Sequence, residues 1–98
     1  MNLISDALLI AVRFSKLLPE GIQNPWVTID DTEKVAFDWE NRDLSLTVIL
    51  KPDDTAVYAA LIPSLNPATP VEHGTVSLHE GMPEPISNIL TRYFRRET

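Results

Sequence analysis

Alternation of apolar and polar residues is the clearest pattern in the sequence, and it is strongest between residues 25 and 62. Val35, Phe37 and Trp39 share one parity, whereas Asp38 and Glu40 share the other. Because successive strand side chains point to opposite faces, this segment places two aromatic rings and a valine in a core and carboxylates in water. The same alternation predicts four consecutive strands, at Val27–Ile29, Lys34–Glu40, Leu44–Leu50 and Ala56–Ile62.

Short polar segments separate these strands, and they contain residue types that favour turns. Two Asp-Asp-Thr triplets, beginning at Asp30 and Asp53, each stand between strands, and Asn41 begins the turn between them. An aspartate or asparagine side chain bonds its own backbone two residues on, which favours a turn. Lys51 to Asp54 has the composition of a type I turn, with proline at its second position. The pattern therefore predicts antiparallel hairpins.

Amphipathic segments flank the strands. Residues 3–18 carry apolar residues over a wider face than one sheet surface requires, with Asn2 as the expected N-cap. A second helix is expected to begin at Pro83 or Pro85, since proline is tolerated in the first turn. Its apolar face comprises Ile86, Ile89, Leu90, Tyr93 and Phe94. Arg92, Arg95 and Arg96 lie in the expected last turns, where the helix dipole favours basic residues.

The stretch between the fourth strand and the second helix is less regular. The segment from Pro63 to Pro70 contains three prolines and predicts an extended loop, and Thr75–His79 predicts a short fifth strand. The element order is then helix, four-stranded meander, loop, strand and helix. It predicts one α+β domain over residues 1–98, a two-layer sandwich with a four- to five-stranded antiparallel sheet and both helices on one face.

Composition narrows the class of protein. The chain has 98 residues, 44% of them apolar, and no cysteine, which fits one packed domain without disulfides or thiolate metal ligands. The apolar start carries Asp6 within it and Arg13 and Lys16 after it, a pattern unlike a signal peptide or a membrane span. These features predict a cytoplasmic protein.

The net charge of −6 is unevenly placed. Residues 19–84 hold twelve acidic and three basic residues, a net charge of −9, whereas both terminal segments are net positive. Nucleic-acid binding needs a basic footprint, so this distribution argues against direct nucleic-acid contact. The acidity either steers the domain toward basic partners or only keeps it in solution.

The titratable residues include two histidines and several carboxylates that could in principle form a catalytic or metal site. His73 and His79 would lie roughly 20 Å apart on an extended strand, too far for one metal ion to bridge. Asp30 and Asp38 share an open sheet face without a cleft to raise either pKa, which argues against paired-carboxylate catalysis. The sequence has no Gly-x-Ser-x-Gly motif and no glycine-rich phosphate loop. We therefore expect no catalytic residues, no cofactor and no metal site.

A run of motifs extends over nearly the whole chain. It comprises Leu18-Pro19-Glu20-Gly21, Pro25-x-Val27-x-Ile29-Asp30-Asp31, Val35-x-Phe37-x-Trp39, Leu44-x-Leu46-x-Val48, Tyr58, Gly74 and Pro83-x-x-Ile86. In this run the chain resembles a group of small bacterial and phage accessory proteins, although Asp-Thr-Glu stands where Asp-Gly-Glu is usual. The resemblance implies a setting in mobile elements or host defence and leaves the mechanism open.

Two functional hypotheses follow. In the first, the domain is a non-catalytic, acidic protein-binding module, for example a phage or mobile-element inhibitor that occupies a basic surface of host machinery. Trp26 either anchors that partner or caps the core. The expected contact residues are Trp26, Asp30, Asp31, Asp38, Glu40, Asp43, Asp53 and Asp54. In the alternative, the domain is an assembly component that forms a homodimer through its helices, and the acid serves only solubility.

Overall fold

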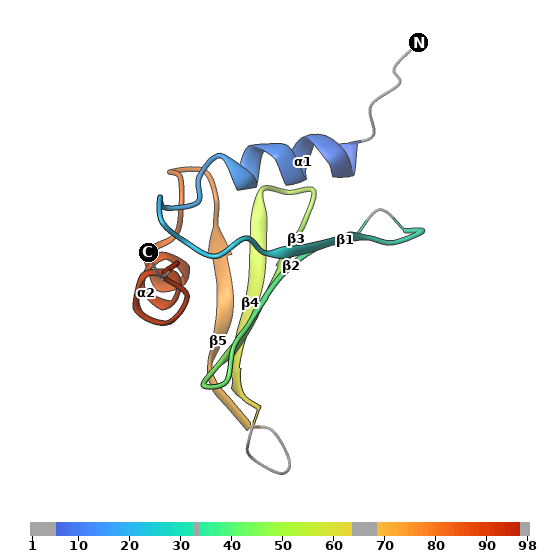
Figure 1. The fold of residues 1–98 in the computed structure, drawn as a ribbon. Coiled ribbons are helices and arrows are strands. Elements are labelled where there is room, and N and C mark those ends of the chain that lie inside the picture. The colour runs from blue at the N-terminus through green and yellow to red at the C-terminus, as the bar shows by residue number, and fades with distance from the viewer. Residues whose placement is uncertain (1–5, 33, 64–68, 97–98) are drawn as a thin grey trace.

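The computed structural model describes residues 6–32, 34–63 and 69–96. Figure 1 shows a strongly twisted sheet with a helix from each end of the chain on one side of it. The sheet has five strands in the sequential order β1-β2-β3-β4-β5, and every neighbouring pair is antiparallel. The elements in chain order are α1 (Asp6–Ser15), β1 (Trp26–Ile29), β2 (Val35–Glu40), β3 (Ser45–Leu50), β4 (Thr55–Ile62), β5 (Thr69–Ser77) and α2 (Glu84–Tyr93). The predicted α+β class is therefore confirmed.

The inner face of the sheet follows the predicted parity. Val35, Phe37 and Trp39 are buried in β2, and they pair with Leu50, Val48 and Leu46 of β3, which are also buried. The alternation of apolar and polar residues is thus sufficient to predict which side chains face the core. A shift of the strand by one residue would move every one of these side chains to the solvent face.

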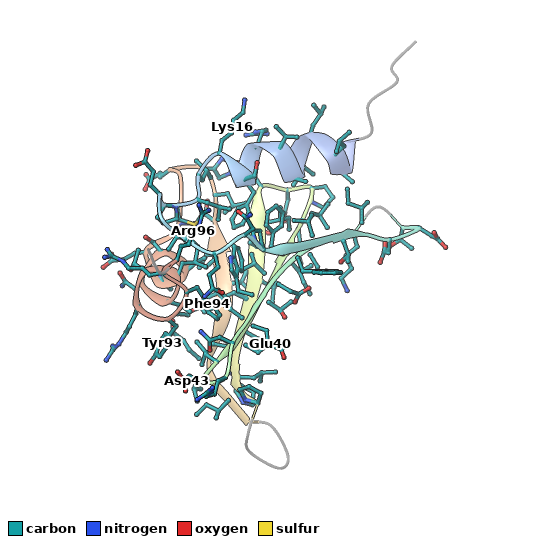
Figure 2. All side chains as sticks on the ribbon, viewed as in Figure 1. Lys16, Glu40, Asp43, Tyr93, Phe94 and Arg96 are labelled. Carbon is teal, nitrogen blue, oxygen red and sulfur yellow. The ribbon has the colours of Figure 1, made fainter. Side chains whose placement is uncertain are left out.

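Both helices cover this inner face. Phe14 of α1 packs edge-on against Phe37, with ring centroids 4.8 Å apart. Ile86 and Leu90 of α2 and Phe94 just after it are fully buried in the same core. Figure 2 shows the Phe94 side chain between α2 and the sheet. Neither helix in the described part of the chain is long and apolar enough to cross a membrane.

The first helix is shorter than its apolar pattern. The pattern covers residues 3–18, whereas α1 extends over Asp6–Ser15, and the predicted N-cap Asn2 lies outside the described residues. After Ser15 the hydrogen bonding changes to the tighter 3₁₀ type, since the amides of Leu17 and Leu18 donate to carbonyls three residues earlier. The exposed side chains of Leu8, Leu9 and Val12 confirm that the apolar surface of this helix exceeds what the sheet covers.

The fifth strand is longer than predicted. It begins at Thr69, so the last two residues of the predicted Pro63–Pro70 loop belong to β5, and it ends at Ser77 before His79. Pro70 is tolerated because β5 is an edge strand, and the register shifts between Ala60 and Leu61 opposite this proline. Residues 64–68 of the predicted loop lie outside the described residues.

The C-terminal segment also differs from its prediction. The helix ends at Tyr93, so Arg92 lies in its last turn as predicted, whereas Arg95 and Arg96 do not. Instead Arg95 forms an antiparallel bridge with Ile22, and the Arg96 amide donates to the Gly21 carbonyl over 2.6 Å. This pairing joins the C-terminal segment to the connection between α1 and β1 and fixes the segment that leads into β1.

Candidate partner-binding surface

The eight predicted contact residues do not form one surface. Asp30 and Asp31 occupy the β1–β2 turn, and Asp53 and Asp54 occupy the β3–β4 turn. Asp43 lies in the β2–β3 turn at the opposite end of the sheet, toward the bottom of Figure 2. The remaining three residues, Trp26, Asp38 and Glu40, lie on the outer face of β1 and β2.

Two of the turn aspartates stabilise their own turns. Asp30 Oδ1 accepts hydrogen bonds from the amide and hydroxyl of Thr32 and from the Lys34 amide. Asp53 Oδ1 accepts the corresponding pair of hydrogen bonds from Thr55. The hydroxyl bonds, from Thr32 and Thr55 respectively, contribute most to lowering the pKa of each aspartate below its usual range. The two Asp-Asp-Thr triplets therefore use the same turn chemistry, as their sequence predicts.

Asp54 is engaged by two basic side chains. Its Oδ2 lies 3.1 Å from His79 Nδ1, and its Oδ1 lies 3.9 Å from an Arg13 nitrogen. Its backbone adopts the left-handed conformation, with φ of 67°, which closes the β3–β4 turn. Arg13, Lys16 and His79 border a hollow of about 310 Å³ here, which the sequence pattern did not predict. Figure 2 shows Lys16 pointing away from the sheet.

Trp26, Asp38 and Glu40 form a cluster, which we name the Trp26 cluster. Trp26 and Asp38 are direct cross-strand partners, so their side chains project from the same face. They border a hollow of about 380 Å³, whose other lining residues are Gln23, Asn24, Trp39 and Glu40. The Trp26 side chain is 76% exposed, so it does not cap the core.

The two carboxylates of the Trp26 cluster differ in exposure, since Glu40 is exposed and Asp38 is half-buried. The Thr47 hydroxyl donates a hydrogen bond of 2.6 Å to Asp38 Oδ1, which orients that carboxylate from the neighbouring strand. Neither Asp38 nor Glu40 forms an ion pair with any residue that the structure describes. The cluster thus combines an exposed indole with two unneutralised carboxylates.

The segment before Trp26 is held from two directions. The Gln23 amide donates to the Phe94 carbonyl over 2.8 Å, and the Gln23 carbonyl accepts from Trp39 Nε1 over 2.9 Å. An Arg96 nitrogen contacts the Ile22 carbonyl at 3.3 Å and Asn24 Oδ1 at 3.5 Å. These hydrogen bonds therefore fix the position of the backbone directly before Trp26. No local sequence signal indicates the contacts of Phe94 and Arg96 with this segment, because the residues that they join are more than 70 positions apart in the sequence.

A third hollow lies on the inner side of β1. We name it the α1–β1 groove; it has a volume of about 460 Å³, and its lining residues are Ala11, Val12, Ser15, Leu18, Asn24, Pro25, Val27 and Phe37. Val27 and Ile29 project toward this side and remain 44% and 41% exposed. The β1 edge of the sheet thus has the Trp26 cluster on its outer face and the α1–β1 groove on its inner face.

The side chains of the Trp26 cluster are suited to contact with basic groups. An indole face attracts cations, and a carboxylate forms charge-assisted hydrogen bonds with arginine or lysine. Within the described ranges, no group of three or more histidine, aspartate and glutamate side chains is arranged to hold a metal ion. Comparisons with protein-family models, curated proteins and solved structures found no match.

Proposed function

We propose that this domain is a non-catalytic, acidic protein-binding module, and that the Trp26 cluster is its contact site for basic side chains of a partner protein. The observation that carries the proposal is the exposed indole of Trp26 beside the carboxylates of Asp38 and Glu40, which have no basic partner among the described residues. Exposed aromatic residues in such settings are typical anchors of protein interfaces.

The electrostatic field supports the same proposal. The segment that forms the sheet carries a net charge of −9 over residues 19–84. Such a field accelerates encounter with a basic surface and makes the association weaken with added salt. The resemblance to phage and bacterial accessory proteins suggests that the partner belongs to nucleic-acid-binding or defence machinery of a host.

A capture experiment tests this function. The immobilised domain is incubated with host lysate at low and high salt, and bound proteins are identified by mass spectrometry. We expect basic proteins to be captured at low salt, and we expect Trp26→Ala and the double variant Asp38→Asn/Glu40→Gln each to lose them.

The matched control is Asp31→Asn/Asp43→Asn, which removes the same charge from exposed turn positions outside the cluster. It should retain most of the capture. Equal losses in both double variants would show that only net charge matters. Undiminished capture by the cluster variants would refute the proposed site.

The alternative function, assembly through a homodimer, is favoured by a different observation. Among the residues that the structure describes, six of the eight exposed large hydrophobic ones lie on α1 and β1, namely Leu8, Leu9, Val12, Trp26, Val27 and Ile29. Size-exclusion chromatography with light scattering at micromolar concentration separates the two: assembly requires a species of twice 11.0 kDa.

A further inference from the structure

The free edge of β1 offers unpaired backbone groups. β1 lies at one end of the strand order and pairs only with β2 in the described part of the sheet. The Asp30 amide donates to the Lys34 carbonyl, which makes these two residues a hydrogen-bonded pair. Hydrogen-bonded pairs alternate along an antiparallel ladder, so Thr28 and Trp26 also direct their backbone groups toward β2. The amides and carbonyls of Val27 and Ile29 therefore point to the open edge.

The two edges of the sheet differ in how well they are protected. β5 carries Pro70 and an irregular register near it, and both features discourage further pairing. β1 has no proline or basic residue within Trp26–Ile29, and all four of its residues are exposed. β1 is therefore the less protected of the two edges, and an extended segment adds to the sheet more readily there.

The faces on either side of β1 define which side chains such a segment needs. Residues of an added strand alternate between the two faces. Those on the inner side lie beside Val27, at the α1–β1 groove, whose lining also includes Val12 and Phe37. Those on the outer side lie beside Trp26, next to Asp38. The matching sequence thus alternates apolar and basic residues.

Charge decides between a partner strand and a second copy of this chain. A second β1 added antiparallel about Thr28 places its own Asp30 opposite Trp26, in the row that continues to Asp38. The two carboxylates then lie in one row, two strands apart with Trp26 between them, and each copy carries a net charge of −6, so the charges of two copies repel one another. A lysine or arginine at that position meets an indole and a carboxylate instead.

We propose that β1 is completed by an extended segment of a partner protein in which basic residues alternate with apolar ones. The segment adds as a sixth strand through the open backbone groups of Val27 and Ile29. Its basic side chains contact the Trp26 cluster, and its apolar side chains fill the α1–β1 groove. This inference rests on the proposed function, and it specifies the conformation and the sequence pattern of the bound partner.

The test uses a short peptide in which arginine and valine alternate, and a control peptide of the same composition with its arginines and valines in separate blocks. Amide hydrogen exchange of the full chain is followed by NMR. We expect the alternating peptide to protect the Val27 and Ile29 amides, which are open in the free protein, and the blocked peptide to leave them unprotected. An alternating peptide that binds without protecting these amides would overturn the inference.

A proline substitution gives an independent test. Ile29→Pro removes an outward amide without removing a bond to β2, whereas the matched variant Ile29→Ala keeps the amide and loses most of the side chain. We expect Ile29→Pro to bind the alternating peptide about two- to tenfold more weakly than Ile29→Ala, the loss that follows from removing about one backbone hydrogen bond. Equal affinities would contradict strand addition, and the amide-exchange result stands even if Ile29→Pro does not fold.

The outcomes separate this inference from the proposed function. If Ile29→Pro captures basic proteins as the wild type does, while Trp26→Ala does not, strand addition is wrong and the binding module stands. If no basic protein is captured by the wild type, the proposed function itself fails. Protection of Val27 and Ile29 that rises with protein concentration in the absence of peptide would show that a second copy occupies the edge, contrary to the inference.

Discussion

Replacing Trp39 should be the most destabilising single truncation in the sheet. Its side chain is 2% exposed, and its ring lies 6.1 Å from that of Phe37 in the core. Its Nε1 donates a hydrogen bond of 2.9 Å to the Gln23 carbonyl, which anchors the segment that leads into β1. The Trp39→Ala variant therefore removes a large apolar surface and a tertiary hydrogen bond together.

The magnitude follows from the area that the ring buries. A buried tryptophan removes about 150–250 Å² from water, worth about 4–6 kcal/mol at about 25 cal/mol per Å². Measured truncations of this kind cost about 3–5 kcal/mol, and we expect Trp39→Ala to fall in that range. Trp39→Phe keeps much of the apolar area and leaves the Gln23 carbonyl without its donor, so its expected cost is about 1–2 kcal/mol.

Urea unfolding followed by circular dichroism measures these differences. With a urea dependence of about 1–3 kcal/mol per molar, Trp39→Ala should lower the midpoint by about 1–5 M, and Trp39→Phe should fall between that variant and the wild type. Trp26→Ala is the matched control, because it removes the same residue type from an exposed position. It should change stability by less than about 0.5 kcal/mol. Equal midpoints for the two tryptophan-to-alanine variants would refute the packing argument.

Two further predictions concern a glycine in β5 and a turn aspartate. A Cβ at Gly74 would lie 3.3 Å from Tyr58 Cε1, so Gly74→Ala should displace the ring and its 2.9 Å hydrogen bond to Glu72, lowering stability by about 1 kcal/mol. A higher urea midpoint for this variant would contradict that prediction. Asp30 has a pKa lowered mainly by the Thr32 hydroxyl, so its contribution to stability is present above the unfolded pKa of about 4 and is lost as the pH falls through the folded value. The stability advantage of the wild type over Asp30→Asn should therefore shrink between pH 6 and pH 3, and a pH-independent difference would rule out this linkage.

The local pattern of the sequence was sufficient for most of the fold. Parity alone assigned Val35, Phe37 and Trp39 to the core, because strand side chains alternate with a period of two regardless of what surrounds them. The two Asp-Asp-Thr turns could also be predicted from the local sequence, since their hydrogen bonds join residues only two to four positions apart. The start of α2 near Pro83 follows from the same kind of local rule.

The longer β5 depended on its neighbour. Gly74 and Pro70 are poor strand residues in isolation. In the structure the Tyr58 ring lies against Gly74, its direct partner on β4, and the edge position leaves room for Pro70. Cross-strand packing therefore outweighed the low strand propensity of these two residues, and this packing cannot be predicted from the local sequence.

The candidate site was decided by tertiary structure in two ways. The acidic residues share a charge pattern in the sequence, but the turns distribute them to both ends of the sheet, and local hydrogen bonds or ion pairs engage Asp30, Asp53 and Asp54. What brings Trp26 beside Asp38 is the β1–β2 register, while the backbone bonds of Phe94 and Arg96 to the segment before β1 fix where that strand begins. Parity predicts on which face a side chain lies, whereas the identity of its neighbour depends on long-range pairing that no local pattern encodes.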